Sequence, residues 1–200
     1  MNSRGADRGQ AWRCAAYIPD YLDSDLEVMV ATHPDANHIG GLDDGLAAFV
    51  VEEIWLNGDI ASRQTYIDFM NAVNAEGAQV YEAQRRDQIT LSDLTFYVLH
   101  PTLPLGSDRN ENLIVLKLSF GQVDFLFTGD VESEVEANMV AAGLIDDIDI
   151  LKGTIVVGTD GKYLRCWTHQ SSATGSALVG RSSQDHPGGF GGGLTLKQLK

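Results

Sequence analysis

The stretch THPDANHIGG, residues 32–41, follows an apolar run and places His33, Asp35, Asn37 and His38 within six positions. Imidazole and carboxylate groups are the ordinary ligands of zinc and its neighbours, and one turn can direct several of them at a single point. His, Asp and His at i, i+2 and i+5, in a loop that leaves a strand, favour a metal site over a structural turn. A complete site needs further ligands from elsewhere in the chain.

The composition is that of a globular domain, because 44% of the 200 residues are hydrophobic and 21% are charged. The 14 Lys and Arg residues against 28 Asp and Glu residues give a formal net charge of -14. This balance disfavours nucleic-acid binding through a basic surface, since that mode neutralises phosphates with Lys and Arg. Any nucleic-acid chemistry would therefore depend on metal ions.

The two cysteines, Cys14 and Cys166, are too far apart for a zinc knuckle or a redox pair, and are interpreted as unrelated thiols. The first residues lack the apolar segment of a signal peptide. No run approaches the ~18 apolar residues that a membrane span requires. The sequence therefore predicts a soluble chain, with a cytoplasmic location by default.

Strand and helix patterns alternate over the first third of the chain. Strands are expected at 27–32 and 52–57, and helices at 39–50 and 62–76, with Gly77 ending the second helix. After this glycine, short strand-like runs indicate mostly antiparallel sheet. These runs are 78–82, 88–91, 94–99, 112–120 and 122–128, followed by a helix at 131–142 and strands at 147–151, 153–158 and 162–167.

Three segments divide the chain by composition. Residues 1–15 are expected to form a flexible N-terminal segment, residues 16–168 one domain, and residues 169–200 a flexible tail rich in Gly and Ser. His169 and His186 lie in this last segment and are expected to be free.

A second candidate ligand is Asp130, in Thr128-Gly129-Asp130 after the apolar strand at 123–127. A carboxylate at the end of a buried strand is a suitable bridging ligand for metal ions. The alternative is structural, because an aspartate before a helix commonly caps its free N–H groups. His100 is interpreted as a surface or strand-end histidine.

Three motifs follow one another along the chain, and their order and spacing indicate a family. They are THPDANHIGGL (32–42), RNENLIVLKL (109–118) and FLFTGD (125–130). Together they resemble the metallo-β-lactamase fold domain of ComEC-type DNA-internalisation competence proteins, over roughly residues 16–165. The resemblance implies an α/β fold, an αββα sandwich with a metal site at one edge between its two sheets. It also implies a metal-dependent hydrolase or nuclease that degrades the DNA strand not taken up.

By position, the resemblance assigns His33 and Asp35 to a first metal ion, His38 to a second, and Asp130 to a bridge between them. One or two ions of zinc or manganese are the implied cofactor. Asp35 and Asn37 stand at the positions that would orient or activate the catalytic water. DNA is the implied substrate, and a membrane channel protein is the implied partner.

The sequence departs from the family's pattern at three places. Asn37 stands where the family has Asp, and an amide is a weaker ligand that cannot act as a base. Leu113 stands where the pattern has Ser. The strand at 148–152 runs straight into GTIVVGTDGKY (153–163), without the family's His-His-Gly-Ser loop. The sandwich is therefore expected to be incomplete.

Two other functions follow from these departures. Asn37 and the missing loop favour a catalytically degenerate domain that survives as a binding or interaction module. The presence of His33, His38 and Asp130 favours an enzyme with full or reduced activity. A related hydrolase of small esters or lactams is a third reading, because the sequence does not separate the substrates.

Overall fold

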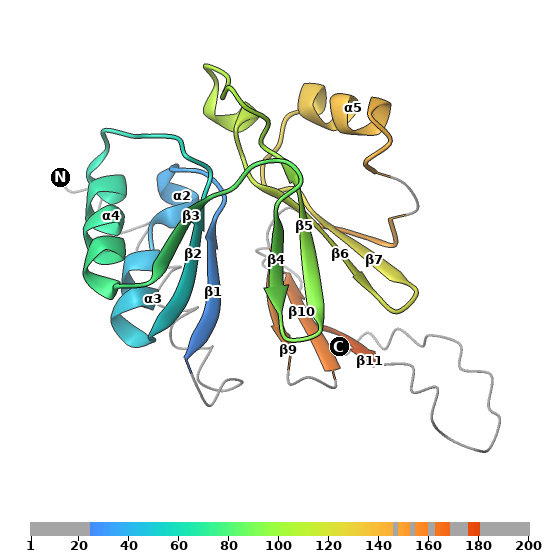
Figure 1. Ribbon diagram of the computed structural model, residues 1–200, viewed down its shortest axis with the longest axis horizontal. Coiled ribbons are helices and arrows are strands. Elements are labelled where there is room, and N and C mark those ends of the chain that lie inside the picture. Colours follow the sequence, from blue (N-terminus) through green and yellow to red (C-terminus); the bar gives the residue numbers. More distant parts are fainter. Residues whose placement is uncertain (1–24, 146–147, 153–154, 160–162, 169–175, 181–200) are drawn as a thin grey trace.

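Two β-sheets lie face to face at the centre of the chain, with helices on their outer faces (Figure 1). The computed structural model describes residues 25–145, 148–152, 155–159, 163–168 and 176–180, and from residue 152 onward only the backbone. The expected N-terminal segment, residues 1–15, lies outside the described residues.

The first sheet is parallel and has the strand order β1-β2-β3. Helices connect its strands, as the alternating pattern predicts, because parallel neighbours require a crossover connection. The last helix ends at Gly77, whose φ of 79° suits a residue without a Cβ. The elements are β1 (Leu26–Ala31), α2 (Ala36–Ile39), α3 (Leu42–Ala48), β2 (Val51–Leu56), α4 (Gln64–Glu76) and β3 (Gln79–Glu82).

The two faces of this sheet bury different side chains, because successive residues of a strand point to opposite faces. In β2, Ile54 packs under the helices and Trp55 packs toward the second sheet. In β1, Met29 likewise faces the helices, and Val28 faces the second sheet. The helical side of the core is completed by Ile39, Leu46, Phe69 and Val73.

The second sheet has the strand order β4-β5-β6-β7-β8. Its neighbours are antiparallel except for β7 and β8, which run parallel. Gly121 makes the tight turn between β6 and β7 with a φ of 64°, as expected for a hairpin glycine. The strands are β4 (Gln88–Leu91), β5 (Leu94–His100), β6 (Val115–Phe120), β7 (Val123–Phe127) and β8 (Ile150–Lys152).

Helix α5 (Ser133–Ala141) covers the outer face of the second sheet. Val135 and Met139 of this helix pack with Leu99, Val115 and Leu126 of the strands. The opposite face of the same sheet packs on the first sheet. The layers are therefore helix, sheet, sheet and helix, which confirms the expected αββα sandwich.

The last described strands form a separate antiparallel sheet with the order β11-β10-β9. They are β9 (Ile155–Thr159), β10 (Tyr163–Thr168) and β11 (Ser176–Gly180). The first two agree with the strands expected there. The third lies inside the segment expected to be a flexible tail, so that expectation does not hold for residues 176–180. The other residues of that segment lie outside the described ranges.

No helix in the described ranges combines the length and the apolar character that crossing a membrane requires. The longest of them, α4, has 13 residues.

Two adjacent residues of α5 test the outer layer of the sandwich. Met139 is 0% exposed, whereas Val140 is 59% exposed. We expect Met139→Ala to lower the free energy of unfolding by about 2–5 kcal/mol, because it leaves a cavity under the helix. Val140→Ala should change it by no more than about 0.5 kcal/mol. Urea unfolding of the full chain measures both, and equal losses would contradict the packing of α5 on the sheet.

Candidate metal centre

Loops from both sheets meet at one edge of the sandwich. The backbone N–H of Ile114 donates to the carbonyl of Thr32 at 3.0 Å, which ties the loop after β1 to the start of β6. Asn57 Nδ2, just after β2, donates to the carbonyl of Asn112 at 3.1 Å. These bonds bring residues that are far apart in the sequence to the same edge of the two sheets.

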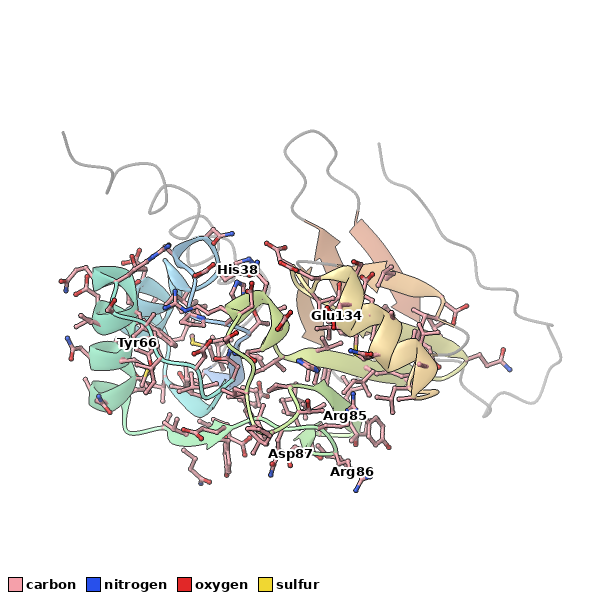
Figure 2. The ribbon with its side chains drawn as sticks, turned by 90° about the horizontal axis from the view of Figure 1, so that it is seen from above. His38, Tyr66, Arg85, Arg86, Asp87 and Glu134 are labelled. Carbon is pink, nitrogen blue, oxygen red and sulfur yellow. The ribbon has the colours of Figure 1, made fainter. Side chains whose placement is uncertain are left out.

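His38 and Asp130 come together at this edge, although 92 residues separate them. His38 Nε2 lies 3.0 Å from Asp130 Oδ2. The side chains are 13% and 58% exposed, so solvent reaches the pair. Figure 2 shows His38 on the side of its layer that faces the second sheet. The contact joins the loop of the first sheet to the loop after β7.

The capping alternative for Asp130 is wrong. The N-cap residue of α5 is Glu132, so Asp130 lies before the capping position. Gly129 permits the turn that presents Asp130, because its φ is 59°. A larger residue would be strained in this left-handed conformation.

His33 is buried beside His38, with 2% of its surface exposed. The two imidazole centroids are 4.0 Å apart. Burial, and secondly the neighbouring His38, lower the pKa of His33 to about 4. The ring is therefore neutral at physiological pH, and the neutral imidazole is the form that binds metal ions.

Asp35 is the N-cap residue of α2 but makes no capping hydrogen bond with its side chain. Its Oδ2 lies 3.9 Å from His33 Nε2, and its Oδ1 lies 3.8 Å from Arg109 Nη1. Asn37 lies exposed in α2 and, among the described residues, makes no hydrogen bond to this group. The structure thus brings together His33, Asp35, His38 and Asp130, and leaves Asn37 outside.

The donor types suit zinc or manganese, but the donor atoms lie in two pairs and do not surround a single point. Two ligands that are each about 2.1 Å from one ion lie roughly 3–4 Å apart. The separations of 3.0 Å for His38–Asp130 and 3.9 Å for His33–Asp35 fall in this range. Within the described ranges, however, no three His, Cys, Asp or Glu side chains are placed to hold an ion as they stand. An ion would require one of the pairs to turn toward the other.

Asn112 holds the loop after β5 in place, a role that sequence reasoning missed. Its side chain is bonded on both sides to Gly106, accepting from the N–H at 2.8 Å and donating to the carbonyl at 2.9 Å. It also donates to Asp59 Oδ2 at 3.3 Å. The residue is 3% exposed, so these bonds satisfy a buried amide. Leu113, next to it, is 0% exposed and belongs to the core.

His100 fastens the same loop to the end of β5. Its ring Nε2 lies 2.6 Å from the carbonyl oxygen of Glu111, and the residue is 7% exposed. The interpretation as a strand-end histidine is correct, but the surface position is wrong. Burial lowers the pKa of His100; the Glu111 carbonyl opposes this shift and Arg85 adds to it. The ring acts as a neutral donor.

A cavity of about 190 Å³ lies beside His33. Its polar lining includes Asp59, Tyr66 and Glu82, and Phe69 contributes to the apolar part. Burial, together with the charges of Asp59 and Glu82, raises the pKa of Tyr66. Figure 2 shows Tyr66 on α4, away from the second sheet. The cavity therefore lies next to His33, on the helical side of the first sheet.

The layered fold and the His- and Asp-bearing edge agree with the resemblance to ComEC-type metallo-β-lactamase fold domains. The chain is similar to ComE operon protein 3 of Bacillus subtilis (strain 168), with 28% identity over 127 residues. This match covers 64% of the chain and only 16% of that protein. It confirms the resemblance to ComEC-type proteins.

The chain was also compared with solved structures and with family models. A solved structure titled CmlA, a diiron beta-hydroxylase from Streptomyces venezuelae, covers 65% of this chain and 25% of its own, with a TM-score of 0.43 and 13% identity. No family model matches the chain.

The pH dependence of stability tests the buried state of His100. Its folded pKa lies below the ordinary histidine value of 6.5, so the unfolded state binds more protons than the folded state as the pH falls through 6.5. The stability that the neutral ring contributes is therefore present at pH 7.5 and declines toward pH 5.5. We expect His100→Leu to cost about 1–3 kcal/mol at pH 7.5, because the Glu111 carbonyl loses its donor.

Urea unfolding at both pH values measures this cost. We expect the difference between wild type and His100→Leu to shrink at pH 5.5. The same difference at both pH values would contradict the account of a buried neutral imidazole.

Proposed function

We propose that the chain is a metal-dependent hydrolase domain that acts on phosphodiesters, with DNA as the substrate class. The contact between His38 and Asp130 carries this proposal, because it joins two sequence-distant ligand candidates at a solvent-reachable edge. The buried neutral ring of His33 lies against the same pair. The similarity to ComE operon protein 3 supports DNA as the substrate, through the role that the ComEC-type resemblance implies.

His38 Nε2 and Asp130 Oδ2 would hold the ion, which would replace their direct contact of 3.0 Å. When bound, a divalent ion supplies a Lewis acid and an activated water. His33 would supply a further neutral nitrogen. Asp35 would accept a proton from water, since its carboxylate makes no capping bond. The Asn37 amide cannot do this, because it is not a base.

The net charge of -14 requires that phosphate be attracted locally and not by the whole surface. A divalent ion at the edge would supply such a local positive charge. We further propose that the domain works beside a membrane channel protein, because the resemblance implies a role in DNA uptake. The match covers 16% of the length of that relative.

A catalytically degenerate binding module is the second candidate function. It is favoured by the exposed Asn37, which makes no hydrogen bond to the described site residues, and by the lack of three converging donors in the described ranges. In that case the edge would still bind a partner but would not cleave it. Metal content and cleavage, measured together, separate the two functions.

Asp130→Asn, compared with Glu134→Gln, tests the hydrolase. Glu134 is an exposed acidic residue on α5, so its variant makes the same change in charge away from the contact (Figure 2). We expect Asp130→Asn to bind zinc and manganese at least about tenfold more weakly, because the amide is a poor ligand. Cleavage of single- and double-stranded DNA should fall in parallel, and Glu134→Gln should match wild type.

Metal content after dialysis and gel-based cleavage assays give both readouts. A wild type that cleaves no faster than Asp130→Asn would refute the hydrolase. Metal binding without cleavage would support the binding module.

Asn37→Asp tests whether the lost carboxylate limits the site. We expect the substitution to raise metal affinity about tenfold, because it restores an anionic ligand one residue before His38. Asn71→Asp adds the same charge at an exposed position of α4 and should leave the affinity unchanged. Competition with a chromogenic chelator measures both. Equal affinities for Asn37→Asp and wild type would show that the missing loop, and not residue 37, is the defect.

A further inference from the structure

Arg109 lies beside the candidate metal centre, and the proposed hydrolysis gives it no role. Its Nη1 lies 3.8 Å from Asp35 Oδ1, whose partner oxygen faces His33. The Arg109 side chain is 36% exposed, so a substrate can reach it. Among the described residues, the Asp35 carboxylate is the group with which this guanidinium pairs. Most of its five N–H donors therefore remain available.

The backbone around Arg109 is fixed on both sides. Arg109 begins a short turn, η2 (Arg109–Glu111), and Asp108 Oδ1 accepts from the N–H of Asn110 at 2.9 Å. At the other end, the carbonyl of Glu111 lies 2.6 Å from His100 Nε2. Asn112, which follows Glu111, is buried, and its side chain donates to the carbonyl of Gly106 at 2.9 Å. The turn is thus anchored while the guanidinium itself is exposed.

Arg109 supplies a positive charge at an edge that carries acidic side chains. Asp35 and Asp130 are acidic residues at this edge, so a phosphate would meet repulsion there without a cation. A second metal ion would need an anionic ligand, but Asn37 is neutral and lies outside the group. A guanidinium is always charged and presents a fork of donors that matches phosphate oxygens.

We propose that Arg109 binds a phosphate of the DNA substrate and supplies the fixed positive charge that a second metal ion would otherwise provide. The pair with Asp35 is loose, since 3.8 Å exceeds hydrogen-bond length. A phosphate can therefore displace it at little cost, because exposed ion pairs contribute little to stability. This inference rests on the proposed function, because it names the substrate contact of the same site.

Equilibrium binding of a short fluorescein-labelled oligothymidine to metal-free full-length protein tests the inference without catalysis. We expect Arg109→Gln to weaken binding about tenfold, the loss typical of a charge-assisted hydrogen bond. Arg109→Lys should be intermediate, because it keeps the charge but loses the fork. Asp35→Asn should bind more tightly, since it removes a competitor for Arg109. Anisotropy titrations measure all three variants.

The salt dependence separates a phosphate contact from a structural role. We expect Arg109→Gln to reduce the slope of log affinity against log salt by about 0.7, the value for one phosphate contact on a single strand. Arg86→Gln is the matched control, because Arg86 is an exposed cation that lies well apart from His38 in Figure 2. Wild-type affinity and slope in Arg109→Gln would overturn the inference.

The two proposals fail in different ways. If Asp130→Asn abolishes cleavage while Arg109→Gln binds and cleaves as wild type does, Arg109 is no substrate contact and the hydrolase stands. If wild type neither binds the oligothymidine nor cleaves DNA, both proposals fall.

Discussion

The contact of His38 Nε2 with Asp130 Oδ2 at 3.0 Å depends on the whole sandwich, because each residue is presented by a different sheet. His38 is delivered by the crossover that follows β1, and Asp130 by the loop that follows β7. The sheets are held in this relation by apolar side chains between them, including Trp55 and Phe125. Any shift of one sheet over the other would separate the imidazole from the carboxylate.

Polar anchors at the edge convert this packing into a defined site. Within the loop after β5, the Asn112 side chain bonds to Gly106, and it also bonds to Asp59 outside the loop. His100, at the end of β5, bonds to the carbonyl of Glu111 in the same loop. These groups are buried and bonded, so moving the loop would leave them without partners. The same loop carries Arg109, the one cation that an ion pair links to Asp35 among the described residues. The site therefore combines a neutral buried imidazole, exposed carboxylates and an anchored guanidinium.

Much of the fold could be predicted from the sequence, because it follows from local patterns. Apolar periodicity and the glycines at 77, 121 and 143 locate most of the strands and helices, and the ligand loop THPDANHIGG follows β1 as expected. The layers followed from a resemblance in motif order. Strand β11 was missed, because its Ser- and Gly-rich surroundings suggested a tail.

The site could be predicted only in part, because its decisive contacts are tertiary. The sequence indicates His33, Asp35, His38 and Asp130 as donors, but it does not show that they form two pairs instead of one converged group. Nothing in the pattern RNEN indicates that Arg109 meets Asp35, since 74 residues separate them in the sequence.

The account depends most on the claim that the loops of the two sheets form one metal-binding edge. A crystal of the full chain grown with zinc, with anomalous diffraction recorded above and below the zinc absorption edge, tests this claim directly. The account expects an anomalous peak within bonding distance of His38 Nε2 and Asp130 Oδ2. A zinc-loaded crystal with no peak there, or with His38 and Asp130 held apart, would contradict it.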